Sequence, residues 1–229
     1  MLEDLKALVC ETNRRLPESG LVTLTWGNVS GFDRDKGLMV IKPSGVPYEK
    51  LTPKHMVIVD LIGTVAEGKL NPSSDTPTHL MLYRNFETIG GIVHTHSMHA
   101  TMFAQACREL PCLGTTHADH FCGTVPVARA LTNNEVIEDY EGNTGKVIVE
   151  RFKGLDPEAI PGVLVAHHAP FTWGATPEKA LDNGIALEAV AKIALGTVTL
   201  NPDIGHVPPH ILNKHYTRKH GPDATYGQR

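Results

Sequence analysis

Apolar and polar residues follow two rhythms along the first third of the chain. Apolar positions recur at helical spacing over residues 2–16, which predicts an N-terminal helix that ends near Pro17. Three β-branched runs follow at residues 21–30, 37–45 and 56–65, with Gly, Pro and Asp between them. Such closely spaced runs predict consecutive strands that are joined by tight turns and pair antiparallel.

Helix and strand patterns are mixed over the rest of the chain. A helix is predicted over residues 73–86, with Thr76 as its N-cap and Pro77 in its first turn, where the missing amide donor costs nothing. Thr132 and Glu135 have capping-box spacing, which predicts another helix start. The remaining predicted elements are strands at 90–96, 146–152 and 162–168 and helices at 96–107, 176–196 and 208–221.

The order of these elements bears on the fold class. Several strands run together, and the helices are interspersed without the strict β-α-β alternation that a parallel sheet requires. This order favours an α/β fold, a single-domain layered α/β/α sandwich around a largely antiparallel central sheet, over a parallel doubly wound fold. A length of 229 residues suits one domain, and we find no internal repeat, linker or low-complexity tract.

Composition and charge indicate which partners and which cellular compartment to expect. A formal net charge of -4 shows neither a basic excess nor an acidic tail, so neither nucleic acid nor a membrane is expected as a partner. The four cysteines lack the spacing of a structural zinc site or a disulfide framework, which favours a reducing compartment. The acidic start is unlike a signal peptide, and no uninterrupted apolar stretch approaches the roughly 18 to 20 residues of a membrane helix. We expect a cytoplasmic protein.

A pair of histidines indicates a candidate metal site. His94 and His96 stand two residues apart in a predicted strand, so both side chains project from one face and can converge on a cation. His167 or His168 can supply a third imidazole, and the pattern does not choose between them. Asp75 can add a carboxylate, although Asp before a helix is more often a cap. Such N and O ligands with an open position describe a catalytic zinc site, and they also suit other divalent metals.

Three loops have the composition of anion-binding turns. Residues 25–30, 42–46 and 71–77 each combine Gly or Pro with hydroxyl or amide side chains at the ends of predicted strands. Ser73 and Ser74 directly precede a helix start, where free amide groups and the helix dipole favour a phosphate. Each loop alone is more often an ordinary turn. Grouped around a metal, they would suit a small phosphorylated substrate.

Several sequence motifs, taken together and in order, resemble those of a known protein family. The sequence resembles the class II aldolase/adducin family over nearly its whole length, and within that family the epimerases of ketopentose phosphates. The motifs that carry the likeness are LVTLTWGNVS, VIKPSGV, PSSDTPTHL, GGIVHTHS, GTTHAD, NKHY and a terminal YGQ. The chain departs from the epimerase pattern at His120, Cys122 and Thr225 and by the added Arg229, which leaves every expected ligand and acid/base position in place.

The resemblance implies a set of site residues. It places the ligands of one divalent metal per subunit, expected to be Zn²⁺, at Asp75, His94, His96 and His168. Of the adjacent histidines His167 and His168, the resemblance therefore implies His168 as the ligand. Contacts to the substrate and its phosphate fall on Gly27, Asn28, Lys42, Ser44, Gly45, Ser73, Ser74, His215 and Arg218.

An acid/base pair is implied at Asp119 and Tyr226. The resemblance also implies a homotetramer with four-fold symmetry, in which the C-terminal tail, about residues 221–229, reaches a neighbouring subunit. The implied reaction interconverts L-ribulose 5-phosphate and D-xylulose 5-phosphate at C4. Because proton abstraction at C4 would give an unstabilised carbanion, we expect the C3–C4 bond to break and re-form through an enediolate that the metal stabilises.

Two other functions fit parts of the same pattern. One is a class II aldolase that cleaves a fuculose- or rhamnulose-type phosphate and releases the fragments. Such aldolases tend to carry Glu at the position of Asp75, which favours the epimerase. The other is a non-catalytic, adducin-like assembly domain, against which the complete set of expected ligand and acid/base positions argues.

Overall fold

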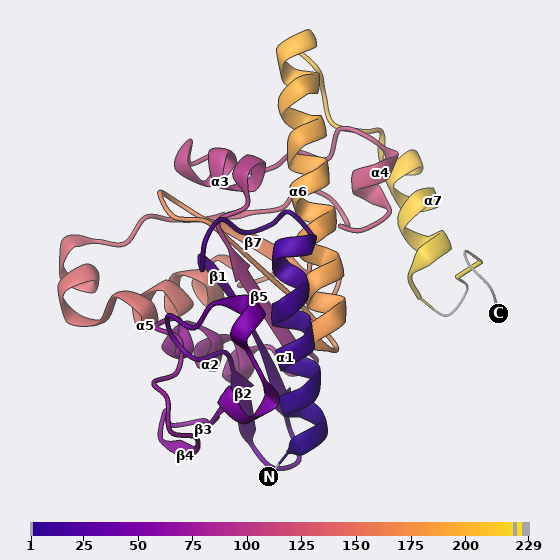
Figure 1. Ribbon diagram of the computed structural model, residues 1–229. Helices are drawn as coiled ribbons and strands as arrows, with labels where there is room; N and C mark the ends of the chain where they lie inside the picture. Colours follow the sequence, from indigo (N-terminus) through magenta and orange to yellow (C-terminus); the bar gives the residue numbers. More distant parts are fainter. Residues whose placement is uncertain (1, 222–223, 226–229) are drawn as a thin grey trace.

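An open eight-stranded sheet forms the centre of the molecule in the computed structural model, which describes residues 2–221 and 224–225. Its strand order is β4-β3-β2-β1-β5-β8-β7-β6 (Figure 1), and every neighbouring pair is antiparallel except β6 with β7. The strands are β1 Gly27–Asp33, β2 Leu38–Ile41, β3 Val57–Asp60, β4 Val65–Glu67, β5 Gly91–Thr95, β6 Val127–Ala128, β7 Gly162–Val165 and β8 Pro170–Gly174. The predicted α/β class with a largely antiparallel sheet is therefore confirmed.

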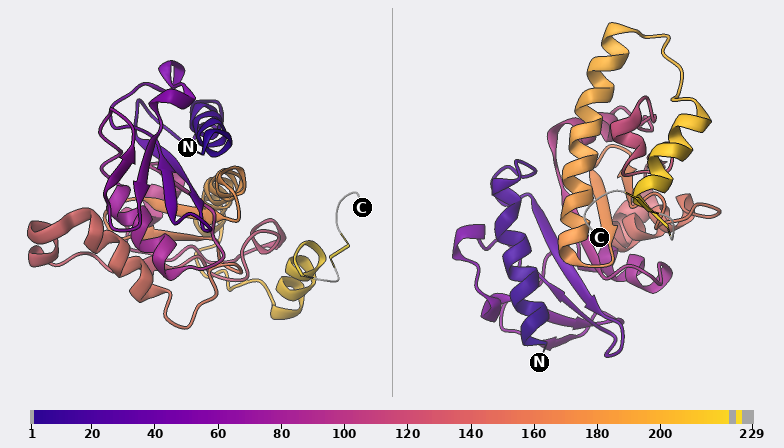
Figure 2. Two further views of the ribbon diagram at one scale, coloured as in Figure 1. Left: turned by 90° about the horizontal axis from the view of Figure 1, so that it is seen from below. Right: turned by 90° about the vertical axis from the view of Figure 1, so that its right-hand side faces the viewer.

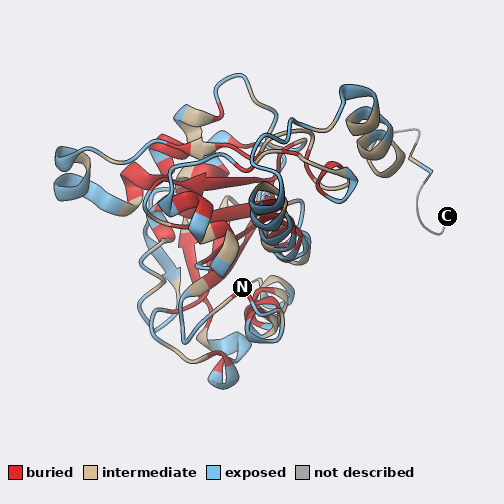
Figure 3. Cartoon of the chain, turned by 90° about the horizontal axis from the view of Figure 1, so that it is seen from above, coloured by how far each residue is buried: buried red, intermediate tan, exposed pale blue. Residues whose placement is uncertain are grey.

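Helices cover both faces of this sheet. The described α-helices are α1 Glu3–Glu18, α2 Thr76–Asn85, α3 Met98–Gln105, α4 Thr115–Ala118, α5 Asn133–Arg151, α6 Pro177–Leu200 and α7 Pro209–Lys219, with short 3-10 turns η1 Tyr48–Lys50 and η2 Pro53–His55. Helices α1 and α6 pack on one face, and α2 and α5 pack together on the other (Figures 1 and 2). The result is the predicted layered α/β/α arrangement, with its buried residues concentrated around the sheet (Figure 3).

Strand β1 shows how the sequence divides between the two layers. Val29 packs in the same cluster as the buried residues of α1, whereas the Ser30 hydroxyl contacts the His79 imidazole and the Tyr83 hydroxyl of α2. Phe32, two residues on, stacks against Tyr83 with ring centroids 4.8 Å apart. The period of two that defines a strand therefore sends Val29 to one core and its neighbours to the other.

Residues 146–152 were predicted as a strand, which is wrong: they form the last turns of α5 and its C-cap, Phe152. The predicted capping box at Thr132 is present, with Thr132 Oγ1 accepting from the Glu135 N–H. Val147, Ile148 and Phe152 are buried, and their i, i+1, i+5 spacing suits one face of a helix packed on α2 better than a strand. The β-branched residues favoured a strand locally, and helix packing overrode that preference.

Other boundaries moved, and some elements carried no sequence prediction. The strand expected over residues 21–30 begins only at Gly27, and Asp75 takes the N-cap position of α2 that Thr76 was predicted to occupy. The expected helix at 176–196 is α6, with Thr176 as its N-cap and with an end four residues later, at Leu200. Strands β6 and β8 and the short helix α4 were not predicted, because each is brief or begins at a proline.

Helix α6 contains no uninterrupted apolar stretch, because charged residues such as Asp182 and Glu188 divide it, yet it is the one described helix that is long and apolar enough on average to span a membrane. By length and composition its residues 177–200 pass that test, with a mean hydropathy of 1.3 in the best window. Its inner half, however, packs against β5 and β8 and supplies buried residues to both cores. A helix that packs in this way belongs to the core of the fold.

Helix α7 lies apart from the sheet and packs against α4 (Figures 1 and 2). None of its described residues is buried. Tyr226, at the expected acid/base position in the tail, lies outside the described residues.

Gly91 offers a sharp test of the packing between β5 and α6. A Cβ atom there would lie 2.4 Å from the Pro177 nitrogen and 2.4 Å from the Thr176 carbonyl carbon. We expect Gly91→Ala to lower the free energy of unfolding by about 1–3 kcal/mol, because two backbones must separate. Urea unfolding at fixed protein concentration measures this loss. Gly196→Ala, where the new methyl group meets nothing within 4 Å, is the control and should raise stability by about 0.5–1 kcal/mol. Equal stabilities of the two variants would contradict the packing argument.

Candidate metal centre and substrate site

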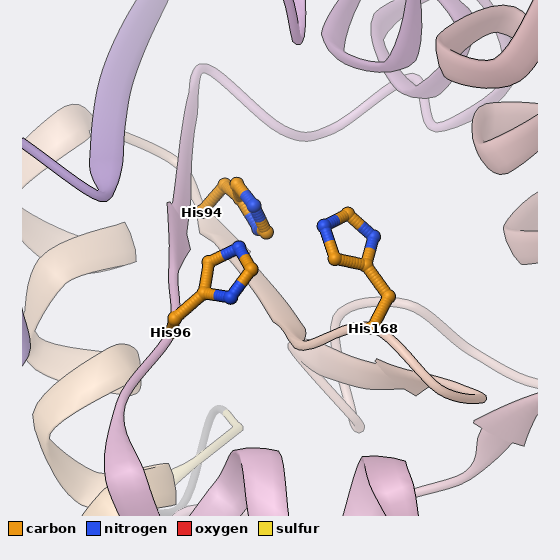
Figure 4. Close-up of side chains that lie close together, drawn as sticks. All are labelled: His94, His96 and His168. Atoms are coloured by element: carbon orange, nitrogen blue, oxygen red, sulfur yellow. The ribbon is translucent and has the colours of Figure 1, made fainter.

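Three imidazoles converge at one end of the sheet. His94, His96 and His168 each offer a ring nitrogen, and these atoms all lie within 4.8 Å of one another. Figure 4 shows the rings pointing toward one another from β5 and from the loop after β7. The end of β5, the start of β1, the end of β2 and the β7–β8 turn all lie at this same end, because the strands alternate in direction.

His94 is the most firmly held of the three. It is buried at the end of β5, directly opposite Asn28 of β1, and its ring stacks on Phe171 with centroids 4.1 Å apart. Its Nδ1–H donates to the Pro170 carbonyl oxygen at 2.9 Å. This bond fixes the ring and leaves Nε2 free for a ligand, which is the usual arrangement of a metal-binding histidine.

His96 and His168 complete the group from less regular backbone. His96 follows the last residue of β5 and is exposed, and its ring centroid lies 5.0 Å from that of His94 and 5.1 Å from that of His168. The structure brings His168 to the group and turns His167 elsewhere. His167 has a left-handed φ of 61° and places its ring against the Cys107 sulfur, 3.4 Å from Nε2.

The environment keeps these imidazoles neutral. Burial lowers the pKa of His94 and of His168 to about 3, and it also lowers the pKa of His96. All three rings therefore carry a lone pair at neutral pH. The Nδ1 atom of His168 is buried without a hydrogen-bond partner among the described residues. Three neutral imidazoles, one of which has a buried nitrogen without a partner among the described residues, fit a divalent cation.

Asp75 stands beside this group but outside the tightest cluster. It occupies the N-cap position of α2, as the helix-cap interpretation expected, but its side chain makes no capping hydrogen bond and is therefore not used as a cap. Its Oδ2 instead accepts from Asn28 Nδ2 at 2.6 Å. The negative charge opposes the effect of burial on the pKa of His96 and of His168. A carboxylate is therefore held within electrostatic reach of the imidazoles.

The loops with anion-binding composition meet at the same end of the sheet. The Ser73 N–H donates to the Lys42 carbonyl oxygen at 3.0 Å, and the Ser44 N–H donates to the Asn71 carbonyl oxygen at 2.9 Å. These two amides are therefore already paired and are not the free donors that the sequence indicated. Gly45, with a φ of 68°, and the exposed hydroxyls of Ser44 and Ser74 remain at the surface of this junction.

Lys42 gives the junction its charge. The residue is only 2% exposed, and its Nζ donates to the Pro43 carbonyl oxygen and lies 5.1 Å from the centre of the Tyr48 ring. The Tyr48 hydroxyl in turn donates to the Gly27 carbonyl oxygen at 2.8 Å, which ties β1 to this loop. Burial lowers the pKa of Lys42. Within the described part of the chain no carboxylate pairs with this ammonium, so it suits a bound anion.

Asp119 lies in a different neighbourhood. It follows α4, and its carboxylate accepts hydrogen bonds from Arg218, at 2.8 Å, and from His215 Nδ1, at 3.0 Å, both on α7. Lys219 Nζ is 3.5 Å away. Burial alone would raise the pKa of Asp119, but these hydrogen bonds lower it below its usual value. Among the described residues, the structure does not bring Asp119, His215 or Arg218 into contact with the three histidines.

Two aromatic residues near the histidines had no role in the sequence analysis. The Tyr140 ring centroid lies 5.9 Å from that of His168, and the Trp26 centroid lies 6.4 Å from that of His96. Tyr140 owes its place to a break in α5, where Asp139 leaves helical geometry and accepts from the Gly142 N–H. The sequence signal was the Asp-x-x-Gly spacing of a helix start inside a longer helix.

The fold and this end of the sheet define a class of α/β proteins with a histidine group suited to a divalent metal. The chain belongs to the family described by the class II aldolase and adducin N-terminal domain, whose model matches residues 7–195.

Solved structures show the same fold. An L-fuculose 1-phosphate aldolase is 27% identical, with a TM-score of 0.78 over 94% of this chain and 95% of that chain. An L-fuculose 1-phosphate aldolase from Glaciozyma antarctica is 16% identical, with a TM-score of 0.77 over 98% and 84%. An L-fuculose-1-phosphate aldolase from Thermus thermophilus is 24% identical, with a TM-score of 0.68 over 88% and 99%. The likeness therefore extends over nearly the whole fold.

The buried ammonium of Lys42 gives a prediction that separates binding from stability. We expect Lys42→Met to weaken the binding of inorganic phosphate by at least about tenfold, because a hydrogen bond to a charged group contributes about 1.5–3 kcal/mol. Stability should not fall, since a buried charge that has no carboxylate partner among the described residues is replaced by an apolar side chain of similar length. Calorimetric titration and urea unfolding measure the two effects. Lys54→Met, at an exposed position, is the matched control, and unchanged phosphate affinity in the Lys42 variant would refute this role.

Proposed function

We propose that this protein is a metal-dependent epimerase that interconverts L-ribulose 5-phosphate and D-xylulose 5-phosphate. The observation that carries the proposal is the convergence of three neutral imidazoles at the same end of the sheet as the buried Lys42 ammonium, which no carboxylate of the described residues neutralises. A sugar phosphate needs both features, a cation at its reacting end and a positive charge at its phosphate. Membership of the class II aldolase family supports the same chemistry.

The reaction itself constrains the route. The C4 hydrogen of a ketopentose phosphate is not adjacent to the C2 carbonyl, so its removal would leave an unstabilised carbanion. Cleavage of the C3–C4 bond avoids this problem, because the electron pair passes toward the carbonyl group. The aldehyde fragment keeps the phosphate, turns over, and accepts the new bond on its opposite face. The residues of the chain must therefore hold both fragments between the two steps.

His94, His96 and His168, together with Asp75, would hold the cation, which we propose to be Zn²⁺. When bound, the metal would supply Lewis-acid stabilisation of the negative charge that develops on the substrate oxygens. The chain contributes rigid placement, since the hydrogen bond from His94 to Pro170 and the hydrogen bond from Asn28 to Asp75 fix two of the four side chains.

The phosphate would lie at the junction of the loops around Lys42. The Asn28 Oδ1 atom is buried without a partner among the described residues, and its strand β1 lies between β2, which leads to this junction, and β5, which carries His94. This Oδ1 atom can accept a hydroxyl hydrogen of the substrate. Ser44, Gly45 and Ser74 offer further donors at the rim, and Gly27 and Ser73 shape the backbone beneath it.

Asp119 and Tyr226 are proposed to transfer the proton of the C4 hydroxyl, one on each side of the aldehyde. In a single chain Asp119 is held by α7 and not by the histidine group. We therefore propose that a neighbouring subunit of a homotetramer completes each site. Exposed apolar residues on the outer part of α6, Ile193 and Leu200 among them, support such assembly. The proposed setting is the cytoplasm, with a phosphorylated ketopentose as the substrate and neither nucleic acid nor a membrane as a partner.

An aldolase that cleaves a fuculose- or rhamnulose-type phosphate is the second candidate, because the family description names an aldolase and several structural neighbours are named L-fuculose 1-phosphate aldolases. Asp75, where such aldolases tend to carry the longer Glu, favours the epimerase. A non-catalytic assembly domain would have no need for the convergent neutral imidazoles.

Product analysis decides between these functions. The purified protein, supplied with Zn²⁺ and L-ribulose 5-phosphate, should yield D-xylulose 5-phosphate in a coupled assay, without accumulation of free glycolaldehyde phosphate. Chelation should abolish turnover, and added metal should restore it. Release of aldehyde from a deoxyhexulose 1-phosphate, with no conversion of the pentulose, would establish the aldolase instead.

Asp119 gives the proposal a residue-level test. We expect Asp119→Asn to lower turnover by at least about a hundredfold, the usual contribution of a general acid/base group, while bound metal stays unchanged. Steady-state kinetics and metal analysis measure the two quantities. The control is Asp203→Asn, which removes an exposed carboxylate elsewhere and should leave both unaltered. Wild-type turnover in the Asp119 variant would remove this residue from the mechanism.

A further inference from the structure

His96 is the least anchored of the three converging histidines. The ring of His94 is fixed by its bond to Pro170, whereas within the described part of the chain the His96 imidazole makes no hydrogen bond. His96 also lies beyond the last residue of β5, so no strand pairing holds it. Its position therefore depends on the short segment that runs from Thr95 to the start of α3.

That segment ends at a helix start with an unusual cap. Ser97 takes the N-cap position of α3, but its side chain makes no capping hydrogen bond. Glu188, on α6, supplies the acceptors instead. Its Oε1 accepts from the His99 N–H at 3.0 Å, and its Oε2 accepts from the Ala100 N–H at 3.0 Å. These are the second and third residues of α3, the same amides that an N-cap side chain normally satisfies.

The same carboxylate binds the side chain of His99. The His99 Nδ1–H donates to Glu188 Oε1 at 2.6 Å, so one carboxylate collects three donors from two successive residues. Burial alone would raise the pKa of Glu188, but the hydrogen bonds from Ala100 and His99 lower it below its usual value. Glu188 is therefore charged at neutral pH, and the positive end of α3 faces it.

We infer that Glu188 is a positioning residue for the proposed metal centre: from α6 it locks the start of α3 and thereby places the His96 imidazole. The inference rests on the proposed metal site and adds a residue that contacts neither metal nor substrate. Thr95 and Ser97, on either side of His96, are buried. If the start of α3 moved, the backbone at Ser97 would therefore carry His96 with it. Outer-shell residues of this kind change metal affinity by about 10- to 100-fold when they are replaced.

The test uses the full-length protein stripped of metal and titrated with Co²⁺, whose visible absorption reports the ligand geometry. Glu188→Gln should weaken Co²⁺ binding by about 10- to 100-fold and alter the absorption bands, because an amide nitrogen would face the N–H donors. His99→Ala keeps both backbone bonds and should weaken binding by less than Glu188→Gln does. Asp182→Asn removes an exposed charge from the same helix and should bind Co²⁺ like the wild type.

The outcomes separate this inference from the proposed function. If the wild type binds no Co²⁺, the metal centre and the positioning role both fail. If the wild type binds Co²⁺ and Glu188→Gln binds it with the same affinity and spectrum, only the positioning role fails, even where the variant unfolds at a lower temperature. An effect of His99→Ala as large as that of Glu188→Gln would also overturn it. Should Glu188→Gln not fold, Glu188→Asp, which keeps the charge but withdraws the oxygens, must show the affinity loss.

Discussion

The antiparallel pairing of β1 with β5 is the constraint on which the rest of the molecule depends. One register sets Asn28 opposite His94 and Gly31 opposite Gly91. Because side chains alternate along a strand, the first pair faces α2 and Asp75, while the second faces α1 and α6. Cβ atoms at Gly31 and Gly91 would both meet Pro177 within 3.0 Å. The same register therefore lets α6 settle on the sheet and places the polar residues of the site.

The sequence was a good guide where local pattern and tertiary structure agree. The amphipathic first helix, the capping box at Thr132 and the start of the long helix at Thr176 were all predicted from residues close together in the chain. Residues 146–152 were misassigned because three successive β-branched residues resemble a strand, and only the packing against α2 shows otherwise. Strand β8 was missed because Pro170 opens it.

In the candidate site, too, features set by neighbouring residues were predictable and features set by distant residues were not. The two histidines at i and i+2 were predictable as neighbours because a strand places them on one face. Pattern alone could not choose between His167 and His168, since the choice depends on the left-handed conformation of His167 in the turn after β7. The partners of Asp75 and Asp119, 47 residues before and 99 residues after them in the chain, were beyond any local signal. The contacts of Glu188 could not be predicted for the same reason, because its hydrogen-bond donors lie 88 and 89 residues away in the chain.

The burial of Lys42 couples occupancy of the site to the stability of the fold. In the absence of an anion the protein bears the desolvation cost of an ammonium group that is paired only with a backbone carbonyl and an aromatic ring. Any anion that binds there compensates that charge and, by linkage, favours the folded state. If the proposed phosphate site is correct, the loops around Lys42, Tyr48 and Ser73 would reach electrostatic balance only with an anion bound, so that ligand supply would itself change the fraction of the protein that stays folded.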